Sequence, residues 1–392
     1  MAGCRAVEQG TPSAVVDTFE PMLAPTPEGG GPTPPTEPGV EDTNRRRRRV
    51  WFALTIAVVL LTLGTLAAAF VQVPYFLLAP GSVRSTEGLI AIEGAPTFET
   101  TGQVDFTTVS VKKATALQAL IGWLDPTVDV VEEDKVLGGQ TQDENRERNL
   151  QEMADSKQIA TAVALEALGY DVGEQGSGAL IVNVAADVPA ADVLQRGDAV
   201  VAAEGQPIQL SSDLVAVIAT KRPGDDVVLR IQRTPELAED VSVRLVARPD
   251  DPNRAMLGVS LETFRLRYEF PFTVTIDSGS VGGPSAGLAF TLGIMDVLTP
   301  DSLTGGVRVA TTGTIDSSGN VGPVGGVQQK TVAVRRAGAT MFLVPPGEYE
   351  EALRYAGDMR VETVETLDDA LRALSSIGGG SGAVERAAPP GG

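Results

Sequence analysis

Two residues in the C-terminal third of the chain, Ser285 and Lys330, are of types that can carry out nucleophilic catalysis together. Ser285 lies in a glycine-rich loop, DSGSVGGPSAG, that precedes an apolar helix-like run, LAFTLGIMDVL. Gly282 and Gly283 allow close approach of another backbone, and Pro284 favours entry into a helix. The unpaired amides at a helix N-terminus can stabilise an oxyanion. The loop therefore fits a nucleophile, and it fits an N-cap serine equally well.

The chain contains no histidine, which restricts the chemistry more than any other count. Ser-His-Asp and Cys-His catalysis and an HExxH zinc site all need an imidazole. The GxSxG nucleophile elbow, which residues 283–287 match formally, needs one too. The single cysteine, Cys4, rules out an intrachain disulfide and a cysteine metal cluster. We expect no cofactor and no metal site, and the base must be another side chain, such as a lysine with a lowered pKa.

Two lysines stand in patterns that suggest such a base. Ser110 and Lys113 match the SxxK pattern of β-lactamases, but they lie in the alternating stretch TTVSVKK, where a strand places them on opposite faces. Lys330 lies in GGVQQKTVAVRRAGA, a predicted helix in which it shares the apolar face with Val327 and Val334. Burial there would lower its pKa toward a value suited to a base. The alternative is a snorkelling lysine whose amine reaches water.

The order of several motifs strengthens the link between these residues. GGPSAG, then TTGTIDSSGNVGPVGGVQQK and RRAGATMFLVP resemble the proteolytic domain of Lon proteases over about residues 257–374. The resemblance implies that Ser285 is the nucleophile, that Lys330 is its partner and that Thr312 supports the lysine. Lon proteases usually carry an acidic residue three positions before the serine, where this chain has Gly282.

The loop around the serine is expected to hold the oxyanion. Gly282, Gly283 and Ala286 are the residues assigned to it. No GxxxxGK[ST] phosphate loop occurs in the sequence, so we expect peptidase activity without ATP.

The N-terminal part of the sequence predicts a membrane anchor. Residues 1–44 are rich in Pro, Gly, Glu and Thr, a composition that predicts disorder. Five arginines, Arg45 to Arg49, then precede an uncharged apolar run from Val50 to Val73. A helix over that run is about 36 Å long, enough to cross a bilayer. Positive charge stays on the cytoplasmic side, so the C-terminal domains are predicted to be extracytoplasmic.

A strand-rich stretch lies in the middle of the chain. Residues 171–246 resemble a PDZ fold, with a turn at Arg196-Gly197-Asp198 and a short helix near Ser211 to Thr220. The loop GEQGSG departs from the Gly-hydrophobic pattern of the PDZ carboxylate-binding loop, so recognition of peptide C-termini stays open.

The predicted fold class is α+β, with an N-terminal transmembrane helix, a PDZ-like β-rich domain and a Lon-type α/β proteolytic domain. The predicted segments are a disordered cytoplasmic tail at 1–44, an Arg-flanked transmembrane helix at 45–73, an extracytoplasmic α/β segment at 74–170, the PDZ-like domain at 171–250, the proteolytic domain at 251–377 and a flexible tail at 378–392.

These observations predict an ATP-independent serine endopeptidase that cleaves unfolded or flexible polypeptides outside the cytoplasm. A net charge of -20 argues against nucleic acid, whose phosphates bind a surplus of Lys and Arg. The expected partners are polypeptide substrates and the lipid bilayer, and resemblance to Lon implies a homo-oligomer, a hexamer. The alternative is a catalytically inert membrane scaffold whose PDZ-like domain binds peptides.

Overall fold

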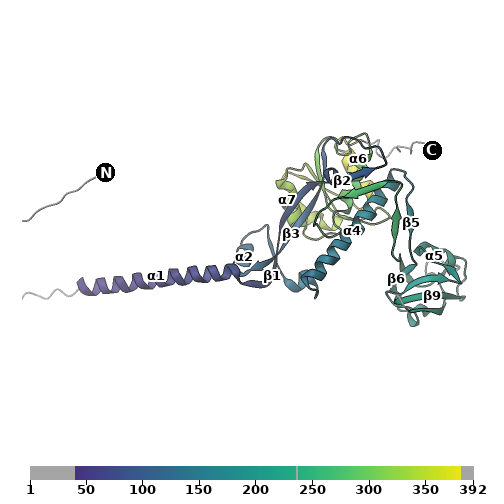
Figure 1. The fold of residues 1–392 in the computed structure, drawn as a ribbon, viewed down its shortest axis with the longest axis horizontal. Helices are drawn as coiled ribbons and strands as arrows, with labels where there is room; N and C mark the ends of the chain where they lie inside the picture. The colour runs from purple at the N-terminus through teal and green to yellow at the C-terminus, as the bar shows by residue number, and fades with distance from the viewer. Residues whose placement is uncertain (1–39, 235–236, 381–392) are drawn as a thin grey trace, which may run out of the picture. The chain divides into compact units, whose positions relative to one another are not determined.

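The computed structural model describes residues 40–234 and 237–380, so most of the predicted tails at 1–44 and 378–392 lies outside the described residues. The chain divides at Gly64 into two units, Met1–Gly64 and Thr65–Gly392. The described residues form a mixed α+β chain, as predicted (Figure 1).

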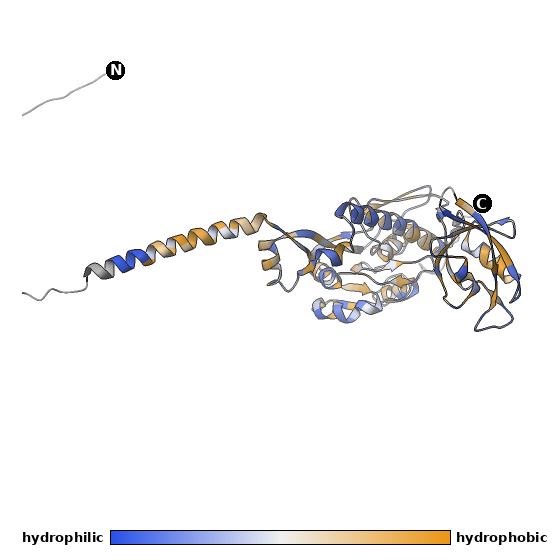
Figure 2. Cartoon of the chain, turned by 90° about the horizontal axis from the view of Figure 1, so that it is seen from below, coloured by the Kyte–Doolittle hydropathy of each residue, from blue (hydrophilic) through white to orange (hydrophobic). Residues whose placement is uncertain are grey.

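Helix α1, Val40–Phe70, is apolar along most of its length (Figure 2). Its stretch Arg45–Phe70 has 26 residues, and the most apolar window within it has a mean hydropathy of 2.3 and is not buried. It is long and apolar enough to cross a membrane. The helix ends three residues before the predicted end at Val73, because strand β1, Gln72–Ser85, begins almost at once.

A six-stranded mixed sheet lies at the centre of the second unit, in the order β20-β19-β16-β3-β1-β4. Its first four strands run parallel, and β1 pairs antiparallel with both β3 and β4. The bounds of the strands other than β1 are Gln103–Thr115 (β3), Asp129–Glu132 (β4), Arg308–Thr311 (β16), Met341–Val344 (β19) and Arg360–Thr363 (β20).

Helices cover both faces of this sheet. Alternate residues of β16 and β19 point to opposite sides: Val309 and Leu343 join the core that contains α4 and α6, whereas Ala310 and Phe342 join the core that contains α7 and α8. The bounds are Gln142–Ala167 (α4), Gly287–Leu298 (α6), Val327–Arg336 (α7), Tyr349–Ala356 (α8) and Leu367–Ser375 (α9). Two short helices, Ala116–Gly122 (α2) and Glu133–Leu137 (α3), flank β4 in sequence.

Apolar or small residues at Ala162, Val163 and Leu165, followed by Gly169, predict a helix from about Glu144 to Leu168, and α4 agrees closely with it. It starts two residues earlier because Thr141 and Glu144 form a capping box, in which each side chain accepts a hydrogen bond from the other residue's amide. It packs against α6, where the Thr291 hydroxyl lies 3.4 Å from the carbonyl oxygen of Ala160.

A second sheet has its own core. It is antiparallel, in the order β10-β9-β7-β6-β13, with β8 paired to β7, and α5 packs on it. The bounds are Ala179–Val184 (β6), Ala199–Ala203 (β7), Gln206–Pro207 (β8), Ser211–Ala219 (α5), Asp226–Thr234 (β9), Leu237–Arg244 (β10) and Val259–Thr263 (β13).

Short pairs of strands complete the fold. The pairs are β2 (Ile90–Glu93) with β15 (Thr273–Ile276), β5 (Gly173–Gln175) with β14 (Arg267–Glu269), β11 (Val246–Ala247) with β12 (Ala255–Met256) and β17 (Thr314–Ile315) with β18 (Val321–Gly322).

Candidate active site

Ser285, Lys330 and Thr312 meet at the carboxyl end of β16. The Lys330 ammonium nitrogen lies 3.0 Å from the Ser285 hydroxyl oxygen and 3.0 Å from the Thr312 hydroxyl oxygen. Ser285 comes from the loop before α6, Lys330 from α7 and Thr312 from the residue after β16. The three predicted residues therefore share one site, although α6 and α7 lie on opposite faces of the sheet.

Ser285 is not a helix cap. Helix α6 begins at Gly287, its N-cap residue is Ala286, and no side chain caps it. The hydroxyl of Ser285 is instead within hydrogen-bond distance of the lysine amine, at 3.0 Å. The capping interpretation is thus wrong, which leaves this half-buried hydroxyl available for chemistry.

Lys330 is 3% exposed, so its amine does not snorkel to water. It lies on the buried face of α7 with Val327 and Val334, as the periodicity predicted. Burial lowers the pKa of the amine from 10.5 to about 8, because the charged form loses its hydration. The carboxylate of Glu348 opposes this shift and raises the pKa. The amine is therefore uncharged in a substantial fraction of molecules near pH 8.

Thr312 links the lysine to the serine backbone. Its fully buried hydroxyl accepts from Lys330 at 3.0 Å and can donate to the Ser285 carbonyl oxygen at 3.3 Å. The Gly313 amide donates to the same carbonyl at 3.0 Å. These bonds fix both the lysine amine and the backbone that carries the nucleophile.

The loop amides differ in what they contact. Among the described residues, the amides of Ser285 and Ala286 donate no hydrogen bond to the chain, so both are free to bind an oxyanion. The Gly283 amide donates to the Asn149 carbonyl of α4 at 2.7 Å. A Cβ atom at Gly282 would lie 2.9 Å from the Asn149 Cβ and 3.2 Å from its backbone, so an acidic residue does not fit there in this conformation.

Helix α4 supports the loop through residues that the sequence analysis did not single out. The Ser156 hydroxyl donates to the Pro284 carbonyl at 3.1 Å, and Asn149 holds Gly283 as described above. Their separation of two helical turns puts them on one face, a spacing that is visible in the sequence. The sequence analysis also did not single out Glu348. Its position shortly after the C-terminal end of β19 could have indicated that it lies near the site.

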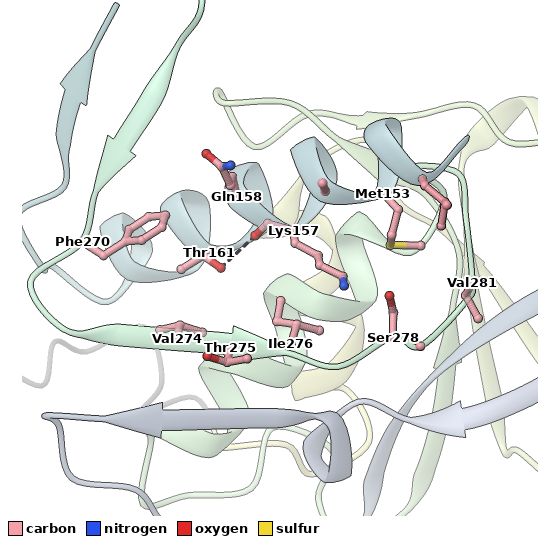
Figure 3. Close-up of a pocket in the computed structure, with 13 residues that line it drawn as sticks. Met153, Lys157, Gln158, Thr161, Phe270, Val274, Thr275, Ile276, Ser278 and Val281 are labelled. Atoms are coloured by element: carbon pink, nitrogen blue, oxygen red, sulfur yellow. Dashed lines mark hydrogen bonds between the residues drawn. The ribbon is translucent and has the colours of Figure 1, made fainter. Parts of the chain in front are cut away.

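A pocket of about 320 Å³ lies between α4 and β15 with the loop that follows β15 (Figure 3). Its lining is mainly apolar, and Lys157 and Ser278 add polar groups that point into the same space. The Ser278 hydroxyl is buried and has no hydrogen-bond partner among the described residues. Val281, at one end of the lining, is four residues from Ser285, a span of at most about 14 Å. The lining thus includes residues of the loop that carries the candidate nucleophile.

The other serine-lysine pattern is not a site. Ser110 and Lys113 both lie on β3, and the Lys113 amine pairs with the Glu133 carboxylate at 2.7 Å. In the described part of the chain, no group of three or more His, Cys, Asp or Glu side chains could hold a metal ion.

The second sheet carries a larger pocket of about 500 Å³ beside α5. It is lined by β13, by β12 and by Leu257 and Gly258 between these strands. The first three residues of the segment GEQGSG instead form β5 and pair with β14. The sequence alone did not indicate the pocket beside α5, because β13 follows the other strands of its sheet in sequence.

Comparison with protein families matches two segments. Residues 166–245 match the PDZ domain, and residues 270–375 match the Lon protease (S16) C-terminal proteolytic domain. A PDZ domain of an SdrC-like protein from Listeria monocytogenes has 28% identity, covering 22% of this chain and 87% of that chain with a TM-score of 0.20.

Curated relatives are Lon proteases. That of Campylobacter concisus is 32% identical over 111 residues, 27% of this chain and 14% of the relative. That of Methylocella silvestris is 29% identical over 168 residues, 42% of this chain and 20% of the relative. This chain therefore matches a fifth or less of these relatives' length. It carries a PDZ domain and, towards its C-terminus, a Lon-type S16 proteolytic domain.

Proposed function

We propose that this chain is a serine endopeptidase that works without ATP, with Ser285 as nucleophile, Lys330 as general base and Thr312 as the residue that orients the lysine. The observation that carries the proposal is the contact of 3.0 Å between the Ser285 hydroxyl and a lysine amine that is 3% exposed. A buried amine with a lowered pKa is the form of lysine that can take a proton from a serine.

The proposed reaction uses each group in turn. The neutral Lys330 amine donates to Thr312 and accepts the Ser285 proton while the serine oxygen bonds to the peptide carbonyl carbon. The amides of Ser285 and Ala286 then stabilise the oxyanion. The lysine ammonium returns the proton to the leaving amine as the C–N bond breaks, and water hydrolyses the acyl-enzyme by the same route.

The pocket beside the loop supports a polypeptide substrate. Its apolar lining suits a peptide side chain, and the Lys157 amine can donate hydrogen bonds to a substrate in the pocket. The PDZ domain, with its own pocket, is proposed to recruit flexible segments of the same substrates.

A serine-reactive activity probe tests the proposal. We expect the purified protein to be labelled at Ser285 and the variant Ser285→Ala to lose labelling entirely. Ser280→Ala is the matched control, since Ser280 is an exposed serine of the same loop and should leave labelling unchanged. Absence of labelling in the wild-type protein would favour the alternative of an inert peptide-binding scaffold.

We further propose that α1 spans the membrane once, with the PDZ and proteolytic domains outside the cytoplasm. Arg45 to Arg49 precede the apolar stretch and favour a cytoplasmic N-terminus. Protease added to intact cells should therefore digest the region after Val73 and spare an epitope placed before Arg45. Digestion of that epitope, with protection of the proteolytic domain, would reverse the orientation.

A further inference from the structure

Helix α2 turns an apolar face outward. Its buried residues are Ala119 and Gly122, and a Cβ atom at Gly122 would lie 2.9 Å from side-chain atoms of Leu77 and Val130. The close packing of this small-residue face leaves Leu120 and Ile121 on the other side of the helix, and Trp123 and Leu124 follow directly after it. These form what we call the α2 patch: Leu120, Ile121, Trp123 and Leu124, which are 55%, 56%, 63% and 80% exposed.

The composition of the patch is unusual for a water-exposed helix. No charged residue occurs between Lys113 and Asp125. Surface helices of soluble domains normally place polar residues on the side away from the core. A contiguous exposed cluster of this kind marks an interaction with a partner or a membrane.

The patch lies next to the point where α1 ends. The Ala116 amide, at the start of α2, donates to the Val71 carbonyl at 2.9 Å. Phe70 and Val71 are themselves exposed apolar residues, and Tyr75 on β1 packs edge-to-face on Trp123 with ring centroids 6.1 Å apart. The exposed apolar residues at the end of α1 thus lie next to the start of α2.

We propose that the α2 patch inserts into the interfacial layer of the leaflet from which α1 emerges. This inference rests on the proposed membrane span, but not on the peptidase reaction. Tryptophan and tyrosine concentrate where headgroups meet acyl chains, because their rings are amphipathic. The chain has two tryptophans, Trp51 beside the arginines and Trp123 in the patch, so they mark the two ends of the span. A lipid surface is favoured over a second copy because the patch adjoins the exposed apolar end of the span at Phe70 and Val71.

The two tryptophans also provide the test. The full chain would be placed in phosphatidylcholine vesicles whose acyl chains carry bromine at a shallow or a deep position. In Trp51→Phe, the remaining emission comes from Trp123, and in Trp123→Phe it comes from Trp51. We expect shallow bromines to quench Trp123 at least twofold, and more than deep bromines do. In Trp51→Phe with Leu120→Glu and Leu124→Glu, this quenching should largely disappear while circular dichroism stays unchanged.

The remaining outcomes would overturn the proposal in distinguishable ways. Quenching of Trp51 without quenching of Trp123 would refute the patch insertion and keep the span. If Trp123 were then also shielded from aqueous acrylamide, a second protein copy would cover the patch instead. Absence of quenching for both tryptophans would refute the span as well.

Discussion

Lys330→Arg is expected to lower kcat by about 10³-fold, because a guanidinium keeps its proton at any accessible pH and cannot accept one from Ser285. Lys330→Met should be equally inactive. Both losses should appear with a short fluorogenic peptide, which needs no recruitment by the PDZ domain. Lys135→Arg is the matched control, since Lys135 is an exposed lysine and its substitution should leave kcat unchanged.

Lys330→Met is also expected to change the stability of the protein. With its pKa lowered from 10.5 to about 8, Lys330 binds its proton less tightly in the folded chain than in the unfolded chain. The free energy of unfolding therefore rises with pH between these two values and is about 3 kcal/mol lower at neutral pH than it would be for an unshifted lysine. At pH 7, Lys330→Met should therefore have a higher free energy of unfolding than the wild-type protein, measured by urea unfolding. Above pH 10.5 this difference should disappear. Substantial turnover by Lys330→Arg would refute the assigned base.

The pH dependence of kcat/KM is the second large effect. Activity requires the neutral amine, and Lys330 has a pKa of about 8, so kcat/KM should rise along one ionisation and level off above that value. Between the plateau and pH 6 the expected decrease is about 100-fold. Because the chain has no histidine, this rise of kcat/KM with pH cannot come from an imidazole.

Glu348 allows this assignment to be checked. Its carboxylate raises the Lys330 pKa, so Glu348→Gln should move the midpoint of the profile to lower pH while keeping the acceptor for the Val324 amide. Glu350→Gln, at an exposed position on α8, should leave the midpoint in place. A midpoint that does not move in Glu348→Gln would mean that another group sets the profile.

The parts of the site that could be predicted are those encoded locally. The apolar spacing around Lys330 gave a correct helix and a correct buried face, because a helix repeats every 3.6 residues wherever it packs. The geometry of Ser285 was harder to predict. A serine before an apolar run fits both a cap and a nucleophile, and only the tertiary contact with Lys330 separates them.

The contacts of α4 could not be predicted from one sequence. The bond from Ser156 to Pro284 joins residues 128 positions apart, and local patterns do not specify which surfaces meet over such distances. The pocket beside α5 was missed for the same reason, because β13 pairs with β6 across most of the domain. The boundaries of α4, which depend on local apolar spacing and capping, were closer to the observed structure.

Because α6 and α7 lie on opposite faces of the central sheet, Ser285 and Lys330 meet only late in the folding of a newly synthesised chain. Neither layer contains both Ser285 and Lys330, so a chain that has packed only one of them has no proton acceptor beside its nucleophile. The lysine helix follows the serine in sequence and is the later of the two to leave the ribosome. On the proposed mechanism, a partly assembled chain therefore cannot cleave its neighbours, and peptidase activity begins only once both layers have packed on the sheet.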